Sequence, residues 1–211
     1  MNIEKLLKKF EAEQIEAFYV ENSDKAREMV VEIIEKKREE CSKKPSEMKI
    51  SWGGSVTLDQ TGIRDEMSRL YDAFNPYSLP PQEQNEGKRK ALLSDVFLMS
   101  ANAITENGEI VNIDGNGNRL AGLIFGPSTV IIVAGINKIT PDIKSAYKRI
   151  KEIACVGNAK RLNRATPCAE NGKCGNCFKA GATICSHTVI TRFSAIPDRI
   201  KLIIVGESLG Y

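Results

Sequence analysis

The sequence lacks a long apolar run. Its longest apolar stretches, such as Val130 to Ile136 and Leu202 to Val205, are far too short to cross a bilayer. The opening MNIEKLLKKFEAEQ has no apolar core and no small-residue cleavage site, so we expect no signal peptide. These absences predict a cytoplasmic protein that makes no contact with a membrane and whose thiols stay reduced.

An excess of charge of one sign is also missing. The net charge is +3, from 30 basic and 27 acidic residues spread along the chain. The basic cluster Lys88-Arg89-Lys90 is not accompanied by interleaved aromatic residues or a groove-reading motif, so we interpret it as a solvated helix face. We expect no nucleic acid as a partner.

Histidine is scarce, because His187 is the one histidine of the chain. We expect it to begin a strand. Glu106 and Glu109 lie in a predicted turn, so the sequence offers no clear general base. It therefore leaves open whether the chain is an enzyme or a non-catalytic binding subunit.

Helical and strand patterns alternate along most of the 211 residues, 42% of which are hydrophobic. Helices are predicted for 3–15, from a cap at Ser23, after Thr57 in capping-box spacing with Gln60, and from Thr140-Pro141-Asp142. Strands are predicted for 17–20, 48–52, 95–105, 108–113, 128–136, 187–193 and 200–207, and a proline-rich loop for 75–87. Short, nearly all-apolar strands between helices indicate one α/β domain over residues 1–211, with a mainly parallel sheet between two helical layers.

A first glycine loop, Trp52-Gly53-Gly54-Ser55, joins a predicted strand to a helix. Glycines allow close approach of the backbone to a ligand, and free N–H groups at a helix start attract negative charge. Ser55 and Thr57 would add hydroxyl donors. No lysine follows at the spacing of a Walker loop, and a tight turn without a ligand is an equally good interpretation.

A second glycine loop, DGNGNRLAG, covers residues 114–122. Gly115 and Gly117 suggest unusual backbone angles or a close ligand, and beside them Asn118 and Arg119 can bind a carboxylate or phosphate. A structural salt bridge is the alternative role of Arg119. Both glycine loops follow predicted strands, so they can meet at the carboxyl edge of the sheet as a crevice for a small anion.

Four cysteines and the single histidine are concentrated in residues 165–187. The spacing C-x5-C-x2-C-x7-C contains one close pair flanked by single cysteines, whereas zinc sites with four cysteines usually show two close pairs. This spacing favours an iron–sulfur cluster, with zinc as the alternative and disulfides as the weakest one. The predicted ligands are Cys168, Cys174, Cys177 and Cys185.

Two cysteines stand apart from this segment. Cys155 ends a helical stripe and is interpreted as a small core residue. Cys41 follows a charged helix and is interpreted as an exposed thiol without a role.

Four stretches together resemble the lactate-utilisation (LUD-domain) family. They are WGGSVTL at 52–58, DVFLMSANAITENGEIVNIDGNGNR at 95–119, VIIVAGINKI at 130–139 and TPCAENGKCGNCFKAGATICSHTVI at 166–190. The resemblance implies a fold related to sugar-phosphate isomerases and CoA transferases. It also implies a part in the oxidation of L-lactate to pyruvate, beside iron–sulfur partner proteins, with the two glycine loops lining the small-molecule site.

Three functions fit these observations. The first is a lactate-utilisation protein with an iron–sulfur cluster beside the anion crevice. The second is an isomerase- or transferase-type enzyme with a structural metal, and the third is a non-catalytic subunit that binds a small molecule.

Overall fold

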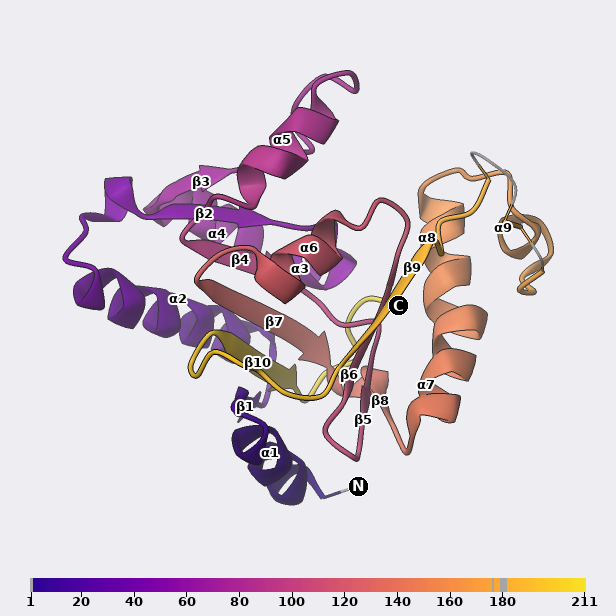
Figure 1. Cartoon of the computed structure of the whole chain (residues 1–211), viewed down its shortest axis with the longest axis horizontal. Coiled ribbons are helices and arrows are strands. Elements are labelled where there is room, and N and C mark those ends of the chain that lie inside the picture. Colours follow the sequence, from indigo (N-terminus) through magenta and orange to yellow (C-terminus); the bar gives the residue numbers. More distant parts are fainter. Residues whose placement is uncertain (1, 176, 179–181) are drawn as a thin grey trace.

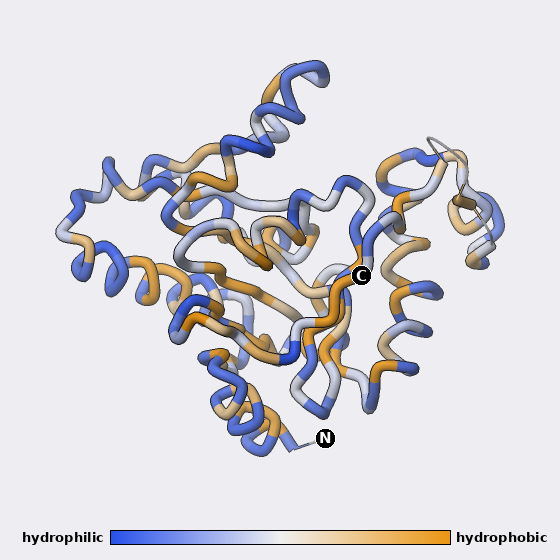
Figure 2. Tube along the Cα trace, in the orientation of Figure 1, coloured by the Kyte–Doolittle hydropathy of each residue, from blue (hydrophilic) through white to orange (hydrophobic). Residues whose placement is uncertain are grey.

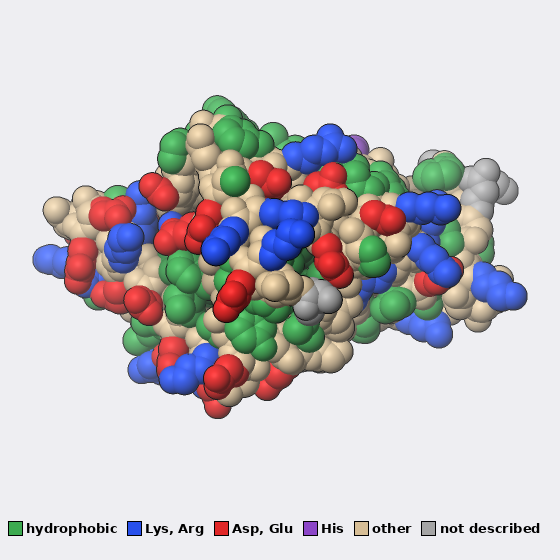
Figure 3. Space-filling view, turned by 90° about the horizontal axis from the view of Figure 1, so that it is seen from below, with side chains coloured by type: hydrophobic (Ala, Val, Ile, Leu, Met, Phe, Trp, Pro, Cys, Tyr) green, Lys and Arg blue, Asp and Glu red, His purple; other side chains and the backbone are tan. Residues whose placement is uncertain are grey.

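The computed structural model describes residues 2–175, 177–178 and 182–211. Two β-sheets lie side by side, and helices cover them (Figure 1). Within the described residues no helix is both long and apolar enough to span a membrane. The face seen in Figure 3 carries basic and acidic side chains close to one another.

The larger sheet has six parallel strands in the order β1-β10-β7-β4-β2-β3. These strands are β1 (Glu16–Val20), β10 (Ile200–Val205), β7 (Thr129–Gly135), β4 (Val96–Met99), β2 (Lys49–Trp52) and β3 (Asp72–Phe74). Every residue of β4, β7 and β10 is buried, which explains their unbroken apolar sequences. Figure 2 shows these central strands as a mostly hydrophobic layer.

Helices cover both faces of this sheet. On one face α2 (Ser23–Glu40) and α4 (Ile63–Leu70) pack with Ile131 and Val133 of β7. On the other, α1 (Ile3–Ala12), α5 (Gln84–Ala91) and α6 (Asn118–Phe125) pack with Val130 and Ile132 of the same strand. Successive side chains of one strand thus enter different layers, and the predicted three-layer α/β arrangement is confirmed.

The second sheet was not predicted. It has the order β8-β5-β6-β9, with β8 (Ile139–Thr140), β5 (Ala103–Thr105), β6 (Ile110–Asp114) and β9 (His187–Thr191). Only β5 and β8 run parallel. A continuous helical run packs on this sheet: α7 (Ile143–Arg149), the π-helical turn η3 (Ile150–Ala154) and α8 (Cys155–Arg161). This unit carries the cysteine-rich segment, which includes α9 (Pro167–Asn171).

Several predicted elements need correction. The expected strand 95–105 is two strands, β4 and β5, because the chain leaves the first sheet at Ser100 and enters the second. The expected strands 108–113 and 187–193 correspond to β6 and β9 and belong to the second sheet. The expected loop 75–87 contains the start of α5, and α6 was not predicted because its first turn follows a glycine-rich loop.

The helix caps also differ from the prediction. Asn22, not Ser23, caps α2, and Asp142, not Thr140, caps α7 by accepting from the Ser145 N–H. Ser55 caps the short helix α3 (Val56–Gln60). Gly62 then has a φ of +68°, a backbone angle that glycine adopts without strain, and it separates α3 from α4.

The chain passes directly from the first sheet to the second in two places. One crossover joins β4 to β5 through residues 100–102, and the other joins β7 to β8 through η2 (Ile136–Lys138). Buried Arg149 of α7 ties them together, because it donates to the Asn102 carbonyl at 2.7 Å and the Asn137 carbonyl at 2.9 Å. Polar groups thus concentrate where the two sheets join.

Candidate functional site

A cavity of about 540 Å³ lies where the two sheets join. Its walls come from the loop after β2, the β4–β5 crossover, the start of α6, helix α8 and the segment 210–211. Six of the eight residues predicted to bind an anion line it; they are Gly54, Ser55, Thr57, Gly115, Asn118 and Arg119. Gly53 and Gly117 lie outside the lining.

The first glycine loop is more fully paired than the sequence suggests. The Gly53 N–H donates to the Leu98 carbonyl at 3.0 Å, and the Gly54 N–H donates to the Tyr77 hydroxyl at 2.8 Å. These two amides are therefore not free for a ligand. A Cβ on Gly53 would clash with Cγ of Arg119, so the glycine leaves room for the Arg119 side chain.

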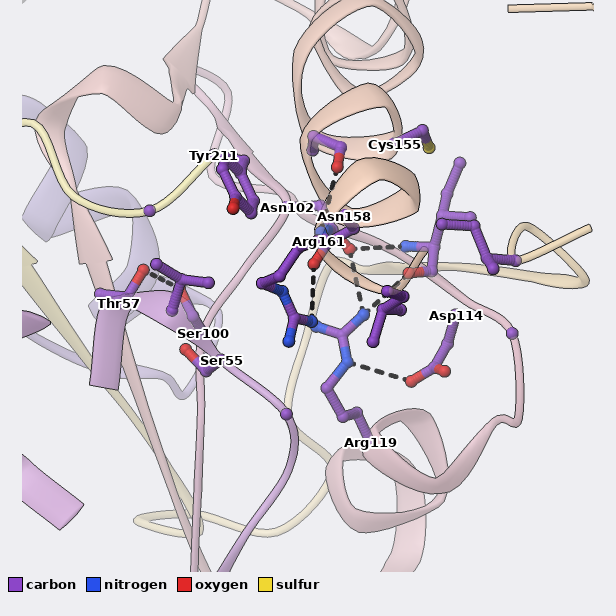
Figure 4. A pocket seen from close by; sticks show the side chains of 18 of the residues that line it. Ser55, Thr57, Ser100, Asn102, Asp114, Arg119, Cys155, Asn158, Arg161 and Tyr211 are labelled. Atoms are coloured by element: carbon purple, nitrogen blue, oxygen red, sulfur yellow. Dashed lines mark hydrogen bonds and ion pairs between the residues drawn. The ribbon is translucent and has the colours of Figure 1, made fainter. Parts of the chain in front are cut away.

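The second glycine loop places Arg119 in the cavity (Figure 4). Gly117 has a φ of +79° and starts α6. The Arg119 Nε donates to Asp114 at 3.1 Å and its Nη2 donates to the Ile113 carbonyl at 2.8 Å, so much of the guanidinium is held by the protein. The salt bridge considered as the alternative role of Arg119 is therefore present, while the side chain still reaches the cavity.

The two glycine loops meet, as predicted. Tyr77 joins them, because its hydroxyl accepts from Gly54 and from the Asn118 side-chain amide at 3.3 Å. The predicted geometry was partly wrong, however. The second loop follows β6, a strand of the second sheet, so the crevice lies between two sheets and not along one parallel edge.

Positive charge exceeds negative charge around the cavity. Among the described residues, its lining contains Arg64, Lys88, Arg119, Lys138, Arg161 and Arg164, but of the acidic residues only Asp59 and Asp114. Asp59 pairs with Arg64, and Asp114 pairs with Arg119. Within the described part of the chain, the other four cations have no carboxylate within 4.0 Å. Such a surplus favours an anionic ligand.

Sequence reasoning missed two residues in the floor of this cavity, Ser100 and Lys138. Both side chains are buried, and the Lys138 Nζ lies 2.8 Å from the Ser100 hydroxyl and 2.8 Å from the Thr57 hydroxyl. Burial, with Arg149 and Arg119 nearby, lowers the pKa of Lys138 to about 7. A lysine within an apolar strand ending, GINKI, was the available signal.

The cysteine segment lies at the α8 side of the cavity. Thr183 and Ile184, just before Cys185, line it, and a Cβ on Gly115 would be 3.3 Å from the Ile184 Cα. The four predicted metal ligands do not line the cavity themselves. Cys168 is buried in α9, Cys174 is exposed, and Cys177 and Cys185 are partly exposed.

Cys155 belongs to this group of thiols, which the sequence did not indicate. It is buried among the core residues of the second sheet and its helices, as predicted. It also lines the cavity, and its Sγ lies 3.3 Å from the Sγ of Cys185. This hydrogen bond, together with burial, raises the pKa of the Cys155 thiol, and the same bond lowers the pKa of Cys185 to about 7. Cys41 is exposed and His187 begins β9, both as predicted.

The thiols fit a soft metal centre by their donor type. Thiolate sulfur is the preferred ligand of iron–sulfur clusters and of structural zinc. In this structure they form a close pair, Cys155 and Cys185, and no three metal-binding side chains among the described residues come close enough to hold an ion. The segment around Cys177 borders residues 176 and 179–181, which lie outside the described part.

Comparisons with known proteins agree with the fold. A crystal structure of a DUF162 family protein from Deinococcus radiodurans superposes with a TM-score of 0.52 over 98% of this chain and 99% of that one, at 12% sequence identity. No curated protein matches the sequence. The family model of the LUD domain matches residues 3–205, nearly the whole chain. The protein therefore belongs to the LUD domain family, which is linked to lactate utilisation.

Proposed function

We propose that the cavity binds a small carboxylate of the lactate and pyruvate class, and that the protein takes part in the oxidation of L-lactate or a related 2-hydroxy acid. The observation that carries this proposal is that three cations of the lining, Lys88, Arg161 and Arg164, have no carboxylate partner among the described residues, and that the partly protonated Lys138 lies beside them. A carboxylate would replace the missing negative charge. Membership of the LUD domain family supports the substrate class.

The lining residues divide into two roles in this proposal. Arg161 and Arg164 are exposed at the α8 side and would attract the anion, and Arg119 is held by Asp114 in a fixed orientation within the cavity. Figure 4 shows Arg119 and Arg161 reaching into the cavity from different helices, α6 and α8. The side chains of Ser55, Thr57 and Ser100 also line the cavity and add hydroxyl groups. Fixed donors of this kind orient a carboxylate without reorganisation when it binds.

We also propose that the cysteine segment holds a metal centre, an iron–sulfur cluster in preference to zinc. Cys168, Cys174, Cys177 and Cys185 would hold it, as the sequence indicates, with the Cys155 thiol beside Cys185. Such a centre would supply one-electron transfer next to the carboxylate site, and iron–sulfur proteins would be its electron partners. The position of Ile184 supports this arrangement, because it precedes Cys185 in the chain and its backbone lies against Gly115 of the cavity lining.

Calorimetric titration of the protein with sodium pyruvate and with L-lactate tests the carboxylate site. Replacing both Arg161 and Arg164 by glutamine should weaken binding by about tenfold or more, because a hydrogen bond to a charged group contributes roughly 1.5–3 kcal/mol. Lys160→Gln is the matched control, since Lys160 is an exposed cation of the same helix outside the lining. Equal weakening by the control, or no binding of either acid, would contradict the proposal.

Anaerobic purification followed by assays of iron, acid-labile sulfide and zinc tests the metal centre. We expect iron and sulfide in the wild type, their loss in Cys174→Ser and their retention in Cys41→Ser, which removes an exposed thiol far from the segment in sequence. Zinc without iron would exclude the cluster. A wild-type protein without either metal would exclude a metal centre altogether.

A further inference from the structure

The floor of the cavity contains a buried lysine with unusual partners. Lys138 is 3% exposed, and both acceptors of its Nζ in the described structure are neutral hydroxyls, those of Thr57 and Ser100. A buried ammonium group ordinarily pairs with a carboxylate, because leaving water is costly without an opposite charge. No carboxylate among the described residues lies within 4.0 Å of this nitrogen.

The three floor residues come from three separate parts of the chain. Thr57 lies in α3, after β2; Ser100 lies in the β4–β5 crossover; and Lys138 ends η2 in the β7–β8 crossover. Their hydroxyls are 3.3 Å apart, and all three side chains line the cavity. The tertiary structure thus builds a compact set of three donors at the bottom of a positively charged cavity.

The charged groups around Lys138 oppose its protonation. Arg149 of α7 and Arg119 of α6 are the cations that face it, and Asp114 of β6 is already paired with Arg119. The other elements packed against Lys138 contribute the uncharged residues Thr57, Ser100 and Gly210. A Cβ on Gly210 would lie 3.2 Å from the Lys138 Nζ. Desolvation and these arginines lower the pKa of Lys138 to about 7, so the amine is mostly neutral above that pH.

We infer that Thr57, Ser100 and Lys138 form the anion-recognition floor of the cavity, and that binding of a carboxylate there places a proton on Lys138. A carboxylate oxygen next to Nζ supplies the missing opposite charge, which favours the ammonium form. The proton comes from solvent, and no covalent bond forms or breaks. The inference rests on the proposed function and adds to it that the anion is bound together with one proton.

Calorimetry of wild-type protein with sodium pyruvate at pH 8.5, in buffers of different ionisation enthalpy, measures this proton directly. We expect an uptake between half a proton and one proton per pyruvate bound. Affinity should fall up to about tenfold for each pH unit between 7.5 and 9, because the proton must be bound in that range. Parallel titrations with L-lactate and inorganic phosphate show whether the floor distinguishes a carboxylate from another anion.

Two variants separate Lys138 from the remaining cations of the lining. Lys138→Gln should remove the proton uptake, whereas Lys88→Gln, which changes a cation at another part of the lining, should weaken binding without altering the uptake. Pyruvate binding without proton uptake by the wild type overturns this inference and leaves the proposed function standing. Failure of all three anions to bind overturns both. The wild-type measurement decides the matter even if Lys138→Gln does not fold.

Discussion

The two sheets of the molecule differ in strand direction, in burial and in the functional residues that lie beside them. The six-stranded sheet is parallel, enclosed by helices on both faces, and buried along its central strands. The four-stranded sheet is mixed, packs against α7, η3 and α8, and leaves His187 and Thr188 of its edge strand β9 exposed. The first sheet therefore provides most of the hydrophobic core, while the second sheet and its helices carry the cysteine segment, and residues of both units line the cavity.

The difference is clearest where the sheets join. A parallel sheet offers few polar side chains in its interior, so the cations and hydroxyls of the cavity come from the crossovers between the sheets and from helices and loops beside both of them. Ser100 and Lys138 lie on the two crossovers between the sheets. Arg149 connects these crossovers through its hydrogen bonds to the Asn102 and Asn137 carbonyls. The comparison predicts that stability and binding respond to different mutations.

The largest effect should follow the removal of a buried side chain from the parallel sheet. Ile203→Ala in β10 removes a side chain that is 0% exposed and should lower the free energy of unfolding by about 2–5 kcal/mol. Ile190→Ala in β9, a half-buried position, should cost about 1 kcal/mol because less apolar surface is lost. Urea denaturation measures both. Equal losses would break the distinction between the two sheets.

A pH-dependent effect of intermediate size should come from Lys138. The unfolded lysine has a pKa near 10.4, and the folded one is lowered to about 7, so unfolding takes up a proton between these values. Unfolding is therefore disfavoured as pH rises. Between pH 7 and 9 the wild type should gain about 2 kcal/mol of stability relative to Lys138→Met. Urea denaturation at several pH values measures the difference, and a constant difference would show that burial does not shift this lysine.

The smallest effect should come from the cap of α7 in the second unit. Asp142 accepts from the Ser145 N–H at 2.7 Å, so Asp142→Ala should lower the free energy of unfolding by about 1 kcal/mol. Pyruvate affinity should stay within twofold of the wild type, since Asp142 is exposed and outside the cavity lining. A large loss of affinity would show that helix α7 and the cavity are more tightly coupled than their contacts indicate.

Local sequence patterns predicted most elements, and the predictions failed where long-range contacts determine the structure. The apolar segment 200–205 and the stripe of α2 were assigned from their own residues, because burial and periodicity act within one element. The break at Ser100 was missed, since VFLM and AIT are both apolar and differ only in the sheet they join. Asp142 was placed in the first turn of α7 and not at its cap, a difference that depends on backbone angles.

The candidate site divides in the same way. Glycine spacing and a basic residue indicated Gly54, Thr57 and Arg119, which line the cavity. The local signal of Lys138 is weak, a lysine within the apolar segment GINKI, because its role depends on hydroxyls 81 and 38 residues away in the chain. Cys155 likewise meets Cys185 only through the packing of α8 against the returning segment.

The α/β class, the family and the position of the cysteine segment could be predicted from the residues alone, because these depend on patterns within short stretches of chain. Tertiary contacts were needed to show the second sheet, the positively charged cavity between the two sheets, and the lysine in its floor, which has no carboxylate partner among the described residues. The physical reason is that burial and charge pairing are properties of neighbours in space. The folded chain alone brings Thr57, Ser100 and Lys138 within hydrogen-bonding distance.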